Sequence, residues 1–298
     1  MSTRMLLLSQ GLVEDEHGLC PHPLLDPWRK DLERYHRQWF SVSPRNPLSW
    51  YAALVRCPPA SLAAAAMPHD RSWAQFWVAT PFHAMLGRDY LRVLPEDQMP
   101  WHERDARWLS ELLNPLLESE GMRLMCKGAA MVLACRDALD ANPPPFAAIA
   151  GGLLPDRHPA GRDGGRLMRL VAEVQMLLHR FPAEHRRQAG EPDIHGLWFW
   201  GASCEQREDL SLLPVATRNP ALRPFVDARN AAWVLAEPAY LHDLLPRDGR
   251  LPRQIILAGR SKAVWLRHRR FVVRRTPWRA GRLKDEERLL ATLGAFLK

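Results

Sequence analysis

Short apolar runs alternate along this chain with longer segments of helical period, and this alternation restricts the possible folds. The runs are short enough to be strands, and they fall at residues 6–8, 73–84, 89–95, 196–201, 231–237, 253–259, 262–267 and 270–275. Strands that alternate with helices are typical of α/β proteins. The sequence therefore predicts an α/β fold with a mixed sheet and flanking helices.

Helical period is strongest in residues 105–121 and 166–181. In the second segment the apolar side chains form one stripe, at positions 167, 170, 171, 174, 177, 178 and 181. Such a stripe indicates an amphipathic helix that packs on a core. Further helices are predicted at 26–39, where Asp26 and Pro27 give a start signal, and at 46–57, 59–67 and 284–298. Gly128 and Ala129 separate two apolar runs and predict a tight hairpin.

A chain of 298 residues is long for one compact unit and short for two large ones. We expect a single domain over 1–298. Pro-rich and Gly-rich stretches at 142–146 and 161–165 make 142–165 the predicted subdomain boundary. Twelve Trp against four Tyr is the unusual part of the composition, and most of these indoles are expected in the core.

The formal net charge of +8 comes from the C-terminal region. Residues 251–284 carry eleven Lys or Arg and no acidic residue, so the rest of the chain carries +8 − 11 = −3. No run of 18 apolar residues exists, and the apolar run Met5–Leu8 is too short for a secretory signal. Five Cys without a Cys-x-x-Cys pair indicate reduced thiols. These features predict a cytoplasmic protein that does not contact a membrane.

Motifs for nucleotide, metal and nucleophilic chemistry are missing. There is no P-loop and no G-x-G-x-x-G, and no G-x-S-x-G elbow surrounds Ser203 and Cys204. The closest spacing of metal-binding residue types, His17, Cys20 and His22, has no second pair beside it. The sequence therefore predicts no catalytic residue, no metal and no cofactor.

Basic residues follow the segment 166–181 and suggest a ligand site. His179, His185, Arg186 and Arg187 can hold a phosphate or carboxylate through charge-assisted hydrogen bonds. The alternative is that they only complement the dipole at the end of the helix. In the first case the facing wall is the segment 198–203, and the candidate ligand residues also include His195, Trp198, Trp200 and Ser203.

The basic C-terminal region suggests a second kind of site. Arg side chains neutralise phosphates and aromatic rings stack on bases, which is the pairing found on surfaces that bind single-stranded nucleic acid. The candidate residues are Arg267, Arg269, Arg270, Arg274, Arg275, Trp265 and Trp278. The alternative is an Arg-rich outer face of two strands whose aromatic residues point inward.

Residues 169–203, which read RLVAEVQMLLHRFPAEHRRQAGEPDIHGLWFWGAS, resemble the signature region of RpfE-type bacterial regulatory proteins, a family also described as phosphoglycerate mutase-like. The residues that fit its pattern are Glu173, Gln175, Met176, Leu177, Leu178, His179, Pro182, Arg186, Gly190, Pro192, Trp198 and Gly201. Residues 76–97 and 112–125 resemble further family segments, so the resemblance covers about 5–240.

The resemblance implies a distant relation to archaeal-type cofactor-independent phosphoglycerate mutases of the alkaline phosphatase-like superfamily. Those enzymes need two metal ions held by Asp and His, and a Ser that becomes phosphorylated. Their first strand ends in Asp-Gly, whereas here it ends in Ser9-Gln10-Gly11. The late Asp-His pair is missing, and the substrate-side Asn positions hold Glu184 and His195. The fold expected from the resemblance is therefore a degenerate mutase-like fold.

These observations predict a non-catalytic, cytoplasmic regulatory protein of the RpfE type that binds a protein partner or a small anionic ligand. Two alternatives stay open. One is a metal-dependent, mutase-like phosphotransferase with relocated ligands. The other is a factor that binds single-stranded nucleic acid through the basic surface 251–284.

Overall fold

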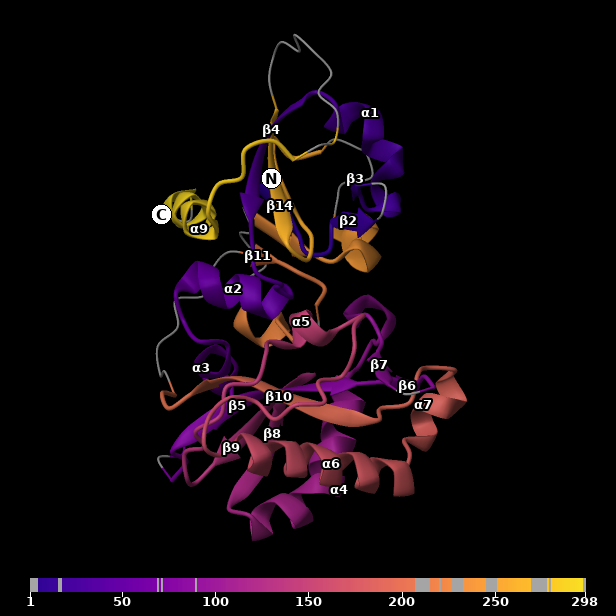
Figure 1. Cartoon of the computed structure of the whole chain (residues 1–298), viewed down its shortest axis with the longest axis vertical. Coiled ribbons are helices and arrows are strands. Elements are labelled where there is room, and N and C mark those ends of the chain that lie inside the picture. Colours follow the sequence, from indigo (N-terminus) through magenta and orange to yellow (C-terminus); the bar gives the residue numbers. More distant parts are fainter. Residues whose placement is uncertain are drawn as a thin grey trace. The chain divides into compact units, whose positions relative to one another are not determined.

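The structure is a computed structural model that describes residues 5–15, 18–68, 70, 72–88, 90–206, 215–219, 221–226, 233–244, 251–268, 278 and 280–296. Packing within the chain divides it into two compact units, shown in Figure 1. Unit 1 comprises residues 1–55 and 212–298, and unit 2 comprises residues 56–211. The chain thus divides at 55/56 and 211/212, and the predicted boundary at 142–165 falls inside unit 2.

Unit 1 contains a six-stranded mixed sheet. Its order is β11 (Val215–Ala216), β12 (Trp233–Ala236), β1 (Met5–Leu8), β13 (Gln254–Ala258), β14 (Lys262–His268) and β4 (Tyr35–Ser41). β1 is parallel to both of its neighbours, while β14 is antiparallel to β13 and to β4. Every residue of β1 is buried, as expected for a central strand that is covered on both faces.

One face of this sheet carries an apolar cluster that includes Leu6, Ile255, Val264 and Leu266. The hairpin of β2 (Leu12–Asp15) and β3 (Gly18–Pro21) follows β1. The helical elements of unit 1 are η1 (Pro23–Trp28), α1 (Arg29–Leu32), α2 (Pro47–Val55), η3 (Arg223–Phe225), η4 (Pro238–Tyr240), α8 (Leu241–Leu244) and α9 (Glu286–Phe296).

The prediction of one helix over 26–39 is wrong. Helical structure ends at Leu32, and residues 35–41 form strand β4 instead. β4 pairs with β14 along its whole length, from Tyr35 opposite His268 to Ser41 opposite Lys262. The local charge spacing favoured a helix, but ladder hydrogen bonds and burial of Trp39 and Phe40 outweigh that weak preference.

Glu14 of β2 ties this hairpin to the turn between β13 and β14. Its carboxylate accepts hydrogen bonds from Ser261 N (2.8 Å), Ser261 Oγ (2.6 Å) and Lys262 N (3.1 Å). Partial burial by itself raises the pKa of Glu14, but these hydrogen bonds and the Lys262 charge outweigh it, so the pKa lies below its usual value of 4.5.

Glu14→Gln should therefore destabilise the protein at neutral pH and have little effect under acid conditions. The folded state binds the Glu14 proton more weakly than the unfolded state, so the contribution is present above pH 4.5 and disappears as the pH falls through the lower, folded-state pKa. Solvent screening limits the loss at pH 7 to about 1 kcal/mol. Thermal unfolding of both proteins at pH 7 and pH 3 measures it, and an equal loss at the two pH values would contradict this assignment.

Unit 2 contains a four-stranded antiparallel sheet with the order β10 (Gly196–Ser203), β5 (Gln75–Phe82), β9 (Ala130–Cys135) and β8 (Met122–Lys127). Figure 1 shows α4 (Glu103–Ser119) and α6 (Gly164–Arg180) on one face of this sheet, with α3 (Pro59–Ala64) and α5 (Phe146–Ile149) on the other. A small hairpin, β6 (Ala84–Leu86) and β7 (Leu91–Val93), follows β5, and η2 (Glu96–Gln98) and α7 (Glu184–Ala189) complete the unit.

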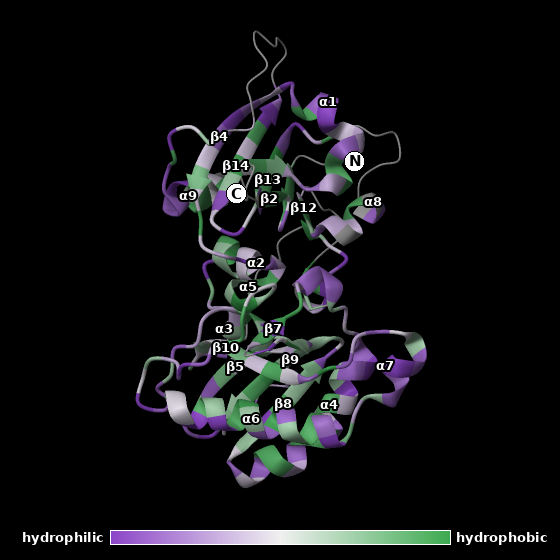
Figure 2. Cartoon of the chain, turned by 45° about the vertical axis from the view of Figure 1, so that its right-hand side comes forward, coloured by the Kyte–Doolittle hydropathy of each residue, from purple (hydrophilic) through white to green (hydrophobic). Residues whose placement is uncertain are grey.

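Cover on both faces explains why the two central strands of this sheet, β5 and β9, are almost entirely apolar. All eight residues of β5 and all six of β9 are buried, so neither strand needs a polar face. α4 and α6 are amphipathic instead, and in Figure 2 hydrophilic and hydrophobic colours alternate along them. The apolar stripe predicted for 166–181 is the buried side of α6, at Leu167, Leu170, Val171, Val174 and Leu178.

Most of the predicted elements are confirmed. Strands are present within 73–84, 89–95, 196–201, 231–237, 253–259 and 262–267, and helices within 46–57, 59–67, 105–121, 166–181 and 284–298. The hairpin at Gly128 joins β8 to β9. The predicted strand 270–275 lies outside the described residues. The α/β class with a mixed sheet and flanking helices is confirmed. In the described part of the chain, every helix is too short or too polar to span a bilayer.

Candidate functional site

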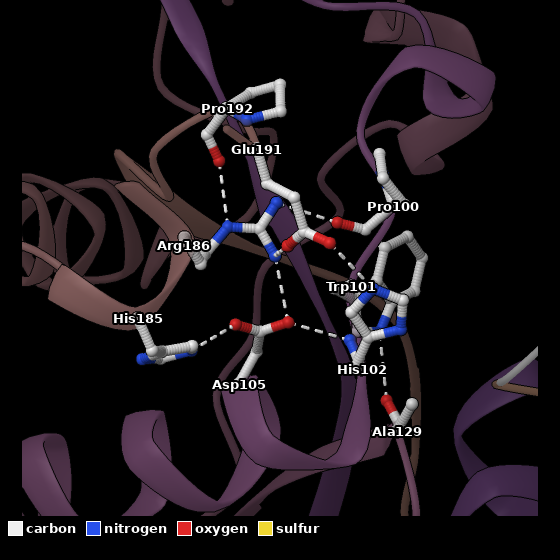
Figure 3. A network of polar contacts seen from close by, with 9 residues as sticks. All are labelled: Pro100, Trp101, His102, Asp105, Ala129, His185, Arg186, Glu191 and Pro192. Carbon is white, nitrogen blue, oxygen red and sulfur yellow. Dashed lines mark hydrogen bonds and ion pairs between the residues drawn. The ribbon is translucent and has the colours of Figure 1, made fainter. Parts of the chain in front are cut away.

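A network of buried charges in unit 2 contains two of the predicted ligand residues (Figure 3). Its centre is Asp105, in the first turn of α4, whose side chain is fully buried. The carboxylate accepts hydrogen bonds from His102 N (2.7 Å), Arg186 Nη1 (2.8 Å) and His185 Nε2 (2.7 Å). A carboxylate three residues into a helix that accepts from the N-cap backbone is half of a capping box, and it also complements the helix dipole.

Arg186 of α7 is the partner charge and has no exposed surface. Besides Asp105 it contacts Glu191 Oε2 at 3.2 Å, and it donates to the carbonyl oxygens of Pro192 and Pro100, each at 2.8 Å. A buried charge is tolerated when it is paired and its hydrogen bonds are satisfied. Arg186 therefore binds protein acceptors from two stretches of the chain, residues 100–105 and residues 191–192.

The side chains at the edge of this network make further contacts between α4, α7 and the turn after α7. His102 Nε2 lies 3.0 Å from Glu191 Oε1, and the ring of His185 packs edge-on against Trp108 at 5.9 Å between centroids. α7 ends at Ala189, and the left-handed φ of 70° at the following Gly190 turns the chain back, so that Glu191 N donates to the Arg186 carbonyl at 3.0 Å. The network thus fastens α7 and the following turn to the start of α4.

Trp198 and Trp200 lie in the core of unit 2, where each is only 1% exposed. Both are on the same face of β10, since they are two residues apart. Trp200 Nε1 donates to Thr80 Oγ1 at 2.8 Å, and Trp198 Nε1 donates to the Pro144 carbonyl at 2.9 Å. Their N–H groups are therefore bound to protein atoms, and their rings fill the space over the sheet.

Ser203 follows a β-bulge in β10, where Gly201 has a φ of 66°. Its Oγ lies 2.6 Å from Ser61 Oγ, and Ser61 Oγ donates to the Glu205 carbonyl at 2.7 Å. Ser203 must then donate to Ser61, because the Ser61 proton is already used. This chain of hydroxyl groups connects β10 to α3 and contains no base that could activate a serine nucleophile.

His195 stacks on His83 at the start of β10, with 4.2 Å between ring centroids. His195 Nδ1 lies 3.2 Å from Ala84 N and 2.9 Å from Ala84 O. It can therefore accept a hydrogen bond from Ala84 N when Nδ1 carries no proton, and donate one to Ala84 O when it does. His83 Nδ1 lies 2.8 Å from the Asp193 carbonyl. Burial lowers the pKa of His195 below 6.5, and positive charge on His83 and His179 lowers it further.

Acidification should destabilise the folded protein through protonation of His195. Because the folded-state pKa of His195 is depressed, the unfolded chain takes up a proton near pH 6.5 that the folded chain resists. The stability contribution is present above pH 6.5 and is lost as the pH falls toward the folded-state pKa. His195→Asn keeps a polar atom near the position of Nδ1, so this variant should lose less unfolding free energy than the parent between pH 7 and pH 5. Urea unfolding at both pH values tests this, and parallel losses would contradict it.

The remaining predicted ligand residues are exposed. Arg187 makes a two-pronged ion pair with Asp193, with contacts of 3.2 Å, and this pair raises the pKa of Arg187. His179 lies in the last turn of α6. The eight candidates therefore fall into distinct sets: His185 and Arg186 at Asp105, the two tryptophans in the core, Ser203 at Ser61, Arg187 at Asp193, His195 at His83, and His179 at the end of α6.

The described part of the basic C-terminal region places its two tryptophans on opposite faces of the sheet in unit 1. Trp278 packs on the face of Trp39, Val264 and Leu266, with the Arg37 guanidinium 4.0 Å from its ring centroid. Trp265 alternates with Val264 and Leu266 in β14 and therefore points to the other face, where Arg267 lies 5.0 Å from its ring centroid. Arg269, Arg270, Arg274 and Arg275 lie outside the described residues.

The carboxyl ends of β1 and β12 are the place where an α/β fold would hold metal ligands. β1 is followed by Ser9, which is buried and donates through Oγ to the Arg45 carbonyl at 3.1 Å. β12 is followed by Glu237, whose Oε2 accepts from Asn219 Nδ2 at 3.0 Å. Among the described residues, no three His, Cys, Asp or Glu side chains gather as a metal site would need. This donor set does not fit a pair of divalent ions.

Sequence reasoning missed Asp105, His102, Glu191, His83 and Ser61. The pattern His102-Glu-Arg-Asp105 before an apolar helical stripe was a usable signal, because an acidic residue at the third helical position marks a helix start. No comparable pattern marks Glu191 or His83. Glu191 follows its partner Arg186 closely, but its other partner His102, like His195 for His83, lies far away in the sequence.

Comparisons with known proteins give one weak similarity. No protein-family profile matches the chain, and no curated protein matches it. A solved structure of a cofactor-independent phosphoglycerate mutase from Thermoplasma acidophilum DSM 1728 is similar over 99% of this chain and 100% of that chain, with 13% identity and a TM-score of 0.34. Similarity at this level does not assign a function, so the RpfE-type and mutase-like assignments stay predictions.

Proposed function

We propose that this chain is a non-catalytic regulatory protein of the RpfE type that acts by binding a protein partner. The observation that carries the proposal is the closed network around Asp105. Arg186, one of the predicted anion-binding residues, and its partner Asp105 are buried and bound to each other and to backbone groups. A group that is used in this way stabilises the fold and does not meet a substrate.

The end of β1 supports the same proposal. Ser9 donates its hydroxyl proton to a backbone carbonyl, and Gln10 follows it with a neutral amide at a φ of 59°. A phosphoryl-transferring serine needs a base or a metal ion to become a nucleophile. Neither residue supplies an anionic oxygen for a hard cation.

Unit 2 also exposes large apolar side chains, which favours a protein partner over a small anion. They are Met85, Leu86, Tyr90, Leu153, Met176 and Phe181, and Leu86 is 85% exposed. Met85, Leu86 and Tyr90 belong to one hairpin, and contiguous exposed apolar side chains mark interaction sites on proteins. The basic side chains near Asp193 that remain exposed are few, and Arg187 among them is already paired.

The proposal is tested by assays for phosphoryl transfer on the full chain. 3-Phosphoglycerate and p-nitrophenyl phosphate, each with Mn²⁺ or Mg²⁺, should give no turnover above a protein-free blank. Metal analysis should find no tightly bound ion. Metal-dependent turnover that falls at least tenfold in Ser9→Ala, but not in the exposed control Ser119→Ala, would overturn the proposal and favour the phosphotransferase alternative.

A further inference from the structure

The β6–β7 hairpin of unit 2 is widened by a third short segment. Arg92 of β7 pairs with Met85 of β6 on one side and forms a bridge with Leu153 on the other. Residues that are directly opposite across neighbouring strands lie on the same face. Met85, Arg92 and Leu153 therefore form a row across the ribbon, which we call the docking row.

The opposite face of the ribbon is buried, so the side chains of the docking row point to solvent. Val93 and Ala84, which alternate with Arg92 and Met85, are 0% and 9% exposed. Met85 is 40% exposed, Leu153 is 59% exposed, and Arg92 is exposed between them. The docking row thus presents apolar, cationic and apolar side chains in that order.

Backbone hydrogen bonds hold the ribbon in place. Leu154 N donates to the Leu91 carbonyl at 2.8 Å, Val93 N to the Gly152 carbonyl at 2.9 Å, and Leu94 N to the His83 carbonyl at 3.0 Å. At the hairpin end, the Tyr90 ring lies so close to Gly87 that a Cβ there would come within 2.6 Å of it. A surface ordered before binding loses little conformational entropy when a partner docks.

Arg92 has capacity for an external anion. Its Nη2 donates to the Gly151 carbonyl at 3.3 Å, and among the described residues no carboxylate forms an ion pair with it. The guanidinium presents further N–H donors in a planar fork that suits a carboxylate. An acidic side chain placed at the middle of the docking row would complete these bonds.

The distance between the two apolar ends of the docking row indicates which secondary structure of a partner fits it. Neighbouring strands lie about 4.8 Å apart, so the two apolar ends are separated by about 9.6 Å. In an α-helix, residues i and i+7 share one face and are about 10.5 Å apart. In an extended chain, residues on one face are separated by about 6.8 Å or about 13.6 Å, and neither value matches.

We propose that the docking row binds an amphipathic helix of a partner protein, which lies across the ribbon. This helix carries apolar residues at i and i+7, which contact Met85 and Leu153, and a carboxylate at i+3 or i+4, which pairs with Arg92. The inference rests on the proposed function as a partner-binding protein and adds the chemistry of the partner. It is the helix-on-surface mode of recognition, with one charge-assisted bidentate contact at its centre.

The probe is a fluorescein-labelled, alanine-based helical peptide of about sixteen residues. It has Leu at i and i+7 and Glu at i+4, and binding to the full chain is followed by fluorescence anisotropy. A second peptide carries Lys in place of Glu. The parent chain should prefer the Glu peptide by at least tenfold. Arg92→Glu should reverse this preference, because the charges of the pair are then exchanged.

Matched variants separate the docking row from general surface effects. Arg169→Glu makes the same charge change on the exposed side of α6 and should leave the preference for the Glu peptide unchanged. Met85→Ala and Leu153→Ala should each weaken binding at least threefold. Met176→Ala removes a side chain that is 66% exposed on α6 and should have no effect.

Three results would overturn the inference: binding of neither peptide, equal binding of both, or the same loss in Arg169→Glu as in Arg92→Glu. Sedimentation of the chain that shows self-association abolished by Arg92→Glu would also overturn it, because the occupant would then be a second copy. None of these results involves turnover. The proposed function fails separately, through phosphoryl transfer in the assays described above.

Discussion

Replacing Asp105 by alanine should destabilise unit 2 by about 3–5 kcal/mol, because the variant leaves the buried Arg186 charge without its main partner. The same change removes the acceptor for His102 N at the start of α4 and the partner of His185 Nε2. Hydrogen exchange at increasing urea concentration measures the effect, since it reports amides of α4 and α7 separately from those of unit 1.

The control for this variant is Glu103→Ala in the same turn of α4. Glu103 makes an exposed ion pair with Arg107 at 3.0 Å, so its loss should cost less than about 1 kcal/mol. If Asp105→Ala cost no more than Glu103→Ala, Asp105 would not stabilise the fold. A role for Asp105 at a functional site would then be the better explanation.

Trp200→Ala should cost about 3–5 kcal/mol, because it opens a cavity in the core of unit 2 and leaves Thr80 Oγ1 without its donor. Trp200→Phe keeps most of the apolar volume and should cost about 1–2 kcal/mol. Urea unfolding followed by hydrogen exchange in β5 and β10 distinguishes the two variants. A ligand-binding tryptophan on an open pocket wall would give a small loss in both, which would contradict the assignment of Trp200 to the core.

The elements that the sequence predicts well are those with a strong local pattern. The apolar stripe of α6 and the two apolar runs around Gly128 are local signals, and the structure forms the helix and the hairpin there. β4 shows the limit, because its residues read as the end of a helix until the partner strand β14, more than 200 residues away, is known. The parallel pairing of β1 with β12 and β13 is equally non-local.

The candidate site was harder to predict, because the same side chains are expected both in a ligand-binding site and in the core of the protein. A run such as Trp198–Trp200 fits a pocket wall as well as a core, and only burial and the N–H partners of the rings assign it to the core. From the sequence alone Arg186 is expected to be an unpaired cation, because no local motif links Asp105 or Glu191 to it. Buried ion pairs depend on tertiary contacts that spacing along the chain does not encode.

Arginine Nε–H resonances of the full chain, followed during a titration with inorganic phosphate and then with 3-phosphoglycerate, test the central claim that Arg186 is structural. The Arg186 Nε–H donates to the Pro192 carbonyl at 2.8 Å, so its resonance should not move at concentrations that shift exposed arginines such as Arg169. A saturable shift of the Arg186 resonance, accompanied by a shift of His185, would contradict the account and place an anion at the Asp105 network.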